Sequence, residues 1–121
     1  PAAVLIGEHD LNKIMDELLD NAFKFSDPGT TIILQTGVEQ FDNAERFVIR
    51  LTDYGRGMTP EQIQGVGAYM QFDRMLYEQQ GSGIGLAIAR GLTELYEGVF
   101  HLYSVPNEYL MVTLAFNIAP N

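Results

Sequence analysis

The stretch E-L-L-D-N-A-F-K-F-S, from Glu17 to Ser26, combines the apolar spacing of a helix with an unusual set of polar residues. Apolar residues recur every three or four positions between Leu11 and Phe25, which predicts an amphipathic helix. A turn of about 100° per residue places Glu17, Asn21 and Lys24 within roughly 60° of one another, beside the apolar stripe. The helix therefore carries a continuous polar edge.

That polar edge has two explanations. The ordinary one is a solvated helix face. Asn, however, is a poor interior helix former because its side chain competes for backbone hydrogen bonds, so Asn21 needs a further reason. An amide oxygen can ligate a hard cation, a carboxylate can orient or deprotonate a nucleophile, and an ammonium can meet a phosphate. Together these groups suit a metal-bound nucleotide.

The rest of the chain predicts one α+β domain over residues 1–121. β-Branched and apolar runs predict strands, a glycine-rich stretch of weak periodicity predicts a long mobile segment, and renewed helical spacing predicts a second helix. The expected elements after the first helix are strands at Thr31–Val38 and Phe47–Asp53, the mobile segment at Gly55–Gly85, a helix at Ile84–Glu97 capped by Gly98, and a hairpin of Val99–Ser104 with Tyr109–Asn117. This order predicts a two-layer sandwich with a mixed, mostly antiparallel sheet covered by helices on one face.

Composition and charge restrict the function. The 121 residues include no Cys, which excludes disulfides and thiolate metal sites. Seven Lys and Arg against sixteen Asp and Glu give a formal charge of −9, which opposes broad attraction to nucleic acid or anionic lipid. No apolar run approaches the ~20 residues that cross a bilayer. Val4–Ile6 looks like a strand already under way, so we expect a domain of a longer protein.

Two glycine clusters add candidate ligand contacts. In L-T-D-Y-G-R-G-M-T, residues 51–59, Asp53 ends a strand; the ordinary explanation is a turn, and the functional one is a carboxylate that accepts hydrogen bonds from a buried ligand amine. In Q-Q-G-S-G-I-G-L-A-I-A, residues 79–89, three alternate glycines open into a helix, whose N-terminus suits a phosphate. The second cluster lacks the setting of a Rossmann unit and the G-K-[ST] of a P-loop. Neither cluster is specific alone.

In order and spacing, these motifs resemble the ATP-binding catalytic domain of sensor histidine kinases over nearly the whole chain. That family shares the Bergerat fold with the ATPase domains of type II topoisomerases, Hsp90 chaperones and mismatch-repair proteins. E-L-L-D-N-A-F-K-F-S resembles the Asn box, D-Y-G-R-G-M the first glycine box and G-S-G-I-G-L-A-I-A the second. Q-F-D-R, with Phe72 and Arg74, resembles the Phe box. The phrases Y-M-Q-F-D-R and Y-E-Q-Q-G-S-G-I-G-L are most similar to hybrid or response-regulator-linked kinases.

The resemblance implies ATP and Mg²⁺ as cofactors and assigns the phosphate end of a site. Asn21 would ligate Mg²⁺, Lys24 would contact a phosphate, and Arg74 would approach the γ-phosphate from a mobile ATP lid at Met58–Gln80. The second glycine box would lead the phosphates onto the second helix through Gly81, Ser82, Gly83, Ile84, Gly85 and Leu86. Metal, lysine and helix N-terminus would supply the positive potential that the acidic surface lacks.

The resemblance also assigns the adenine end. Phe25 would pack near the base, Asp53 would accept a hydrogen bond from the adenine amino group, and Gly55 and Gly57 would line base and ribose. Guanine presents a carbonyl there, so the carboxylate would select ATP. The closing hairpin departs from the family, because S-V-P-N-E-Y-L replaces its glycine-rich turn followed by Thr. Thr113 is the candidate for the missing hydroxyl, although a Thr on a strand is usually only a strand residue.

Glu17 is the second departure, because many histidine kinases have Asn at this position. The pattern E-x-x-x-N also occurs in the ATPases of the wider group, where the Glu is the general base for water. In a kinase, Glu17 would instead orient or accept a proton from the phosphoacceptor imidazole. The alternative function is therefore an ATP-hydrolysing or ATP-sensing module without transfer to histidine.

The two histidines, His9 and His101, both lack the acceptor motif of the family. We expect His9 to have a small capping role at the first helix and His101 to be a packed or edge residue of a strand. The phosphoacceptor would lie on a helical dimerisation domain that precedes residue 1 in the parent, so this domain alone would barely autophosphorylate. The resemblance further implies phosphorelay to a response-regulator receiver domain. It also implies a cytoplasmic location and a domain that is monomeric when isolated. The parent would be a homodimer, either free in the cytoplasm or anchored to a membrane.

Overall fold

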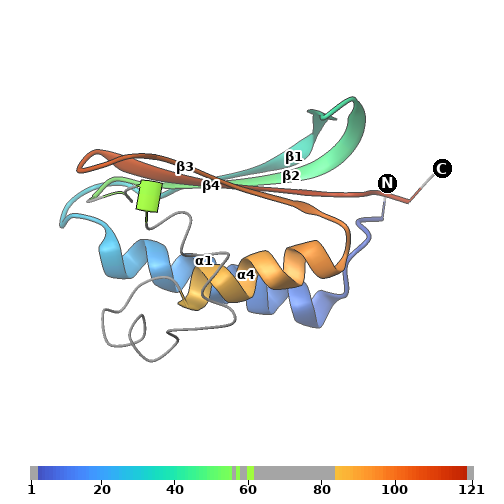
Figure 1. Ribbon diagram of the computed structural model, residues 1–121, viewed down its shortest axis with the longest axis horizontal. Coiled ribbons are helices and arrows are strands. Elements are labelled where there is room, and N and C mark those ends of the chain that lie inside the picture. The colour runs from blue at the N-terminus through green and yellow to red at the C-terminus, as the bar shows by residue number, and fades with distance from the viewer. Residues whose placement is uncertain (1–2, 56, 58–59, 62–83, 120–121) are drawn as a thin grey trace.

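A computed structural model describes residues 3–55, 57, 60–61 and 84–119, which form a two-layer α+β sandwich (Figure 1). Within these residues the helices α1 (Glu8–Phe25) and α4 (Ile84–Leu95) lie side by side on one face of the sheet. The antiparallel sheet has the order β1-β2-β4-β3, with β1 at Ile33–Phe41, β2 at Ala44–Asp53, β3 at Val99–Val105 and β4 at Tyr109–Phe116. The predicted fold class is confirmed. Neither described helix is long and apolar enough to span a bilayer.

The side of the sheet that faces the helices follows from the period of two in each strand. Ile49 and Leu51 of β2 are buried against the helices, and Asp53, two residues further on, lies opposite Leu110 of β4. Residues directly opposite one another in an antiparallel pair share a face. Asp53 therefore points into the layer between sheet and helices. The core between the layers comprises Ile14, Leu18, Ala22, Ile49, Leu51, Leu86, Ala87, Ala89, Leu110, Val112, Leu114 and Phe116.

Both hairpins turn at polar residues with left-handed backbone conformations. Asp42 and Asn43 have φ values of 50° and 66°, which is the left-handed pair of a two-residue turn between β1 and β2. Asn107, with φ 66°, closes the hairpin of β3 and β4. Asn and Asp tolerate this conformation better than other side chains, so the turn residues set the register of both hairpins.

The C-terminal cap of α4 differs from the expected one, because Gly98 is not the residue with the left-handed conformation. Glu97 has φ 60° and occupies the left-handed position, while Gly98 follows it. The Gly98 N–H donates to the carbonyl of Thr93 (2.9 Å) and the Glu97 N–H donates to that of Glu94 (2.9 Å), which are the paired bonds of a Schellman motif. A side chain at position 98 would lie 3.0 Å from the backbone oxygens of Thr93 and Ala115. The glycine is thus required by a close approach rather than by its φ.

Of the expectations for the two histidines, the one for His9 is wrong and the one for His101 is confirmed. α1 begins at Glu8, its N-cap is Gly7, and no side chain of the described residues forms a capping hydrogen bond there. The capping role expected for the exposed His9 is therefore wrong. His101 lies on β3, which is an edge of the described sheet, and its ring centroid is 5.8 Å from that of Phe41. The expectation of an edge residue for His101 is confirmed.

The chain ends pair with each other. Val4 and Ile118 form an isolated antiparallel bridge, and the Leu5 N–H donates to the carbonyl of Asn117 at 2.8 Å. The strand expected at Val4–Ile6 is thus reduced to one bridge outside the main sheet. The two termini lie at the same end of the molecule (Figure 1).

Candidate functional site

The end of α1 is joined to the segment that follows β2. Ser26 forms an isolated antiparallel bridge with Gly55, and the Asp27 N–H donates to the carbonyl of Tyr54 at 2.9 Å. The Thr30 hydroxyl donates to the same carbonyl at 3.1 Å. These backbone contacts bring the helix with the polar edge beside the D-Y-G-R-G segment, two motifs that are distant in the sequence.

Two glycines make this junction possible. A methyl group at Gly55 would lie 2.2 Å from the carbonyl oxygen of Phe25, so the two backbones touch. Gly57 has φ 63°, and a methyl group there would lie 2.7 Å from Ser104 Oγ and from the carbonyl oxygen of Val105. Gly55 therefore anchors the end of α1, and Gly57 anchors the loop to the hairpin of β3 and β4.

Asp53 is a buried carboxyl at the end of β2. Its exposed fraction is 4%, and burial raises its pKa to about 6 because the ionised form loses hydration. Among the described residues, no group donates a hydrogen bond to it and no cation pairs with it. A buried carboxylate of this kind retains the capacity to accept hydrogen bonds from a donor that enters the layer.

The polar edge of α1 faces the beginning of α4. A methyl group at Gly85, the second residue of α4, would lie 3.4 Å from Oε2 of Glu17. Glu17 also pairs with Lys13 at 3.7 Å, one helical turn earlier. The Glu17 carboxylate therefore lies beside the N-terminal turn of α4, where the helix dipole is positive.

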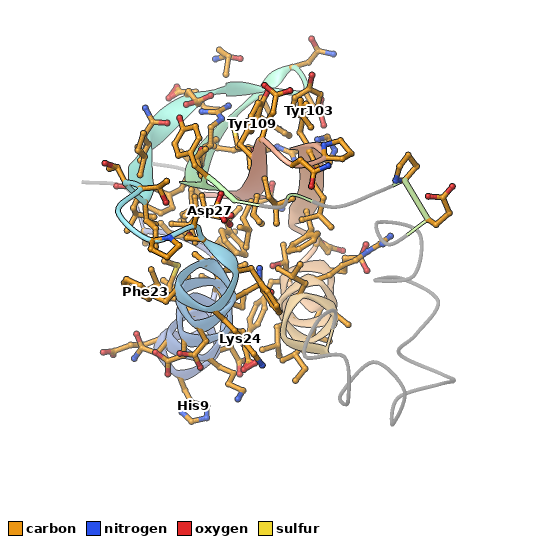
Figure 2. All side chains as sticks on the ribbon, turned by 90° about the vertical axis from the view of Figure 1, so that its left-hand side faces the viewer. His9, Phe23, Lys24, Asp27, Tyr103 and Tyr109 are labelled. Carbon is orange, nitrogen blue, oxygen red and sulfur yellow. The ribbon has the colours of Figure 1, made fainter. Side chains whose placement is uncertain are left out.

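Lys24 and Phe25 lie at the last turn of α1. Lys24 is exposed, and its Nζ is 5.6 Å from the centroid of the Phe25 ring. Figure 2 shows Lys24 on the side of α1 nearer to α4 and Phe23 on the side away from it. The structure thus brings Glu17, Lys24 and the start of α4 to one side of α1 and leaves Phe23 on the other.

The second glycine box is described only from Ile84 onward. The side chain of Leu86 is buried in the core, with an exposed fraction of 1%, so its backbone N–H is the part that can serve a ligand. Ile84 opens α4. The other predicted site residues fall outside the described residues; these are Phe72, Arg74, Gly81, Ser82 and Gly83. Of the predicted lid at Met58–Gln80, only residues 60 and 61 are described.

Thr113 lies on the wrong face for the role considered for it. It pairs with Arg50 of β2 and His101 of β3, whereas Asp53 and Leu110 lie on the alternate, helix-facing positions. Because strand side chains alternate between the two faces, Thr113 points away from the helices. It is not the adenine-side hydroxyl.

The sequence analysis did not predict three residues that contact or hold the candidate site. Lys13 is four residues before Glu17, so an i, i+4 charge search finds this pair. Ser26 and Thr30 hold the junction through the bridge to Gly55 and the bond to the Tyr54 carbonyl. These two roles depend on a contact across the fold, and no local pattern signals them.

The family model that matches the chain describes histidine kinase-, DNA gyrase B- and HSP90-like ATPases, and it covers residues 7–120. Sensor histidine kinase YvrG of Bacillus subtilis is 33% identical over 105 residues, which is 86% of this chain and 17% of the relative. Circadian input-output histidine kinase CikA of Synechococcus elongatus is 33% identical over 96 residues, which is 78% of this chain and 12% of the relative. The chain thus spans under a fifth of the length of these relatives.

Solved structures share the fold. Full-length ShkA in complex with AMPPNP matches 100% of this chain and 24% of its own, with a TM-score of 0.70 and 20% identity. The Acinetobacter baumannii histidine kinase AdeS matches 90% of this chain and 46% of its own, with a TM-score of 0.57 and 18% identity. At these identities the likeness concerns the arrangement of helices and strands.

Proposed function

Because the chain belongs to the family of histidine kinase-, DNA gyrase B- and HSP90-like ATPases, as a sensor histidine kinase catalytic domain, we propose that it binds Mg-ATP for phosphoryl transfer. The γ-phosphoryl group goes to a histidine on a helical dimerisation domain of the parent protein, and from there to a receiver domain. The observation that carries the proposal is the buried Asp53, which lacks a hydrogen-bond donor among the described residues.

At the adenine end, Asp53 accepts a hydrogen bond from the amino group of the base. This bond offsets part of the free energy that the carboxylate loses when burial removes its water, and it is charge-assisted when the carboxyl is ionised. Gly55 and Gly57 let the backbone pass close to the base and ribose, and Phe25 packs near the base. Within the proposal, the carboxylate selects adenine over guanine, because guanine would place its carbonyl oxygen against the carboxylate oxygen of Asp53.

At the phosphate end, Asn21 and Glu17 supply oxygen ligands or acceptors on one edge of α1. Mg²⁺ in nucleotide sites usually takes one or two oxygen ligands from the protein and the rest from phosphates and water, so this edge needs to supply only one or two. When bound, Mg²⁺ supplies positive charge shared with the phosphate oxygens. Glu17 would repel a bare phosphate at the start of α4, so this edge favours a metal-bound one. Lys24, Arg74 and the glycines at 81, 83 and 85 complete the proposed phosphate contacts.

Calorimetric titration with a non-hydrolysable ATP analogue, with and without Mg²⁺, tests the proposal. Asn21→Ala should weaken affinity in Mg²⁺ by about 10- to 150-fold, the value of one hydrogen bond or ligand to a charged group. The loss should disappear in EDTA. Asn12→Ala, an exposed Asn on the same helix, is the matched control and should bind normally. Affinity that is independent of Mg²⁺, or an equal loss in EDTA, would contradict the proposed role of Asn21.

The position of the Glu17 carboxylate beside the first turn of α4 favours a second candidate, in which the domain hydrolyses ATP. Glu17→Gln separates the two functions. We expect the variant to bind the analogue normally and to transfer phosphate from labelled ATP to the parent's dimerisation domain about 100-fold more slowly. Glu94→Gln, on the exposed side of α4, is the control.

Two outcomes would count against the kinase. Steady-state ATP hydrolysis that Glu17→Gln abolishes would favour the hydrolytic candidate. Strong self-labelling of the isolated domain would contradict a phosphoacceptor on another domain. A Glu17→Gln variant that transfers phosphate at the normal rate would remove Glu17 from the mechanism.

A further inference from the structure

The side chain directly opposite Asp53 in the sheet is that of Leu110 on β4. Opposite residues of an antiparallel pair point to the same face, with their Cβ atoms about 4.5–5.5 Å apart. Both side chains are buried, with exposed fractions of 3% for Leu110 and 4% for Asp53. A ligand amine that reaches the Asp53 carboxylate therefore comes within reach of the Leu110 methyl groups.

Leu110 is the cross-strand neighbour of Asp53 in the described sheet. β1 pairs with β2 only as far as Thr52, which lies opposite Ile33, so no residue of β1 is in register with Asp53. On the other side of β2, the pairing with β4 ends at Asp53 and Leu110. Among the paired residues of the sheet, Leu110 thus borders the carboxyl from the neighbouring strand.

β4 presents apolar side chains to the helix-facing layer. Its helix-facing residues all belong to the core, and these are Leu110, Val112, Leu114 and Phe116. Thr113 points to the other face, so its hydroxyl does not reach Asp53. A hydroxyl at position 110 would donate a hydrogen bond to the carboxylate and would compete with a ligand donor. Leucine cannot donate, so it leaves the carboxylate to the ligand and fills the space beside it.

We propose that Leu110 is a specificity-determining residue of the base site, which admits adenine with a free exocyclic amino group and excludes adenine substituted on that nitrogen. The inference rests on the proposed function, in which Asp53 accepts a hydrogen bond from this amino group. The amino group has two hydrogens, and the bond to Asp53 uses one of them. A large substituent in place of the second hydrogen competes with the Leu110 side chain for the space beside the carboxylate.

The selection by Leu110 is steric, whereas the selection by Asp53 depends on a hydrogen bond. A close-packed interior has no gap that an additional ring can enter unless neighbouring side chains move, and such movement costs affinity. Asp53 discriminates against guanine, and Leu110 discriminates against adenine with a bulky amino substituent. A smaller side chain at position 110 should therefore relax the second selection and keep the first.

Calorimetric titration in Mg²⁺ compares a non-hydrolysable ATP analogue with its derivative that carries a benzyl group on the adenine amino nitrogen. The unchanged domain should prefer the unsubstituted analogue at least about tenfold, and Leu110→Ala should reduce this preference at least about tenfold. Leu114→Ala, the same substitution at a buried position further along the same face of β4, should keep the preference. Circular dichroism checks folding. If Leu110→Ala does not fold, Leu110→Val replaces it and should reduce the preference at least about threefold.

A second measurement needs no nucleotide. Thr and Val have similar shapes, so Leu110→Thr and Leu110→Val differ chiefly by one hydroxyl group beside Asp53. Carboxyl-carbon NMR of the ligand-free domain should give Asp53 a lower pKa in Leu110→Thr than in Leu110→Val, because the hydroxyl donates to the ionised carboxylate. Equal pKa values, or a nucleotide preference that the Leu110 substitutions leave unchanged, would overturn the inference alone. An unchanged domain that binds neither nucleotide would overturn the proposed function as well.

Discussion

Asp53→Asn should make the ligand-free domain more stable at about pH 7.5, by about 2–3 kcal/mol, and should weaken its affinity for an ATP analogue. Burial raises the pKa of Asp53 from 3.8 to about 6, so the folded state holds this proton more tightly than the unfolded state. The stability that protonated Asp53 contributes is complete below about pH 4 and is lost as the pH rises through 6. An Asn side chain carries no charge, so it avoids that loss.

Urea unfolding of both proteins across this pH range measures the effect. The difference between Asp53→Asn and the parent should be largest near pH 7.5 and should shrink toward about pH 4.5. Asp16→Asn, which removes an exposed carboxylate from α1, is the control for loss of one negative charge, and its stability at about pH 7.5 should stay within about 0.5 kcal/mol of the parent. A loss of stability at about pH 7.5 in Asp53→Asn would contradict the electrostatic cost of burying this carboxylate.

Nucleotide binding should change in the opposite direction. Asn presents an amide that is a weaker acceptor than a carboxylate, so the analogue should bind about 2–3 kcal/mol more weakly. A more stable protein with weaker binding is the expected sign of a group retained for a ligand rather than for the fold. Unchanged affinity in Asp53→Asn would place the adenine elsewhere and would remove the main support for the proposed function.

Gly55→Ala should destabilise the domain by about 3 kcal/mol. The added methyl group would lie 2.2 Å from the carbonyl oxygen of Phe25, and two backbones have little freedom to move apart. The bridge between Ser26 and Gly55 would open, so the end of α1 would separate from Asp53 and nucleotide affinity would fall as well. For a domain of this size, the melting temperature should fall by more than about 10 °C.

Gly37→Ala is the matched control. Gly37 lies on β1 with an ordinary φ, and an added methyl group there has no atom within 4 Å. Its stability should stay within about 0.5 kcal/mol of the parent. If thermal unfolding shows Gly55→Ala and Gly37→Ala to be equally stable, then the close approach of α1 to the segment after β2 is not what holds the junction.

The sequence alone predicted the elements and one edge of the site. Helices and strands have periods of 3.6 and 2 residues, so apolar spacing located α1, α4 and the strands to within a few residues. The same helical geometry placed Glu17, Asn21 and Lys24 together, because residues three and four apart on a helix are neighbours. The motifs also indicated Asp53 and the glycines by their residue types and order.

The tertiary structure decided what depends on contacts between distant segments. Strand register placed Asp53 on the helix-facing side and Thr113 on the other, and a shift of one residue would have reversed them. The Schellman geometry at Glu97 and the close approach at Gly55 arose from backbone contacts that no local pattern encodes. Leu110 likewise meets Asp53 because β2 and β4 are neighbours in the sheet, although the two residues lie far apart in the sequence. Local spacing determines which face of an element is apolar, but the packing of elements determines which side chains meet and which stay in water.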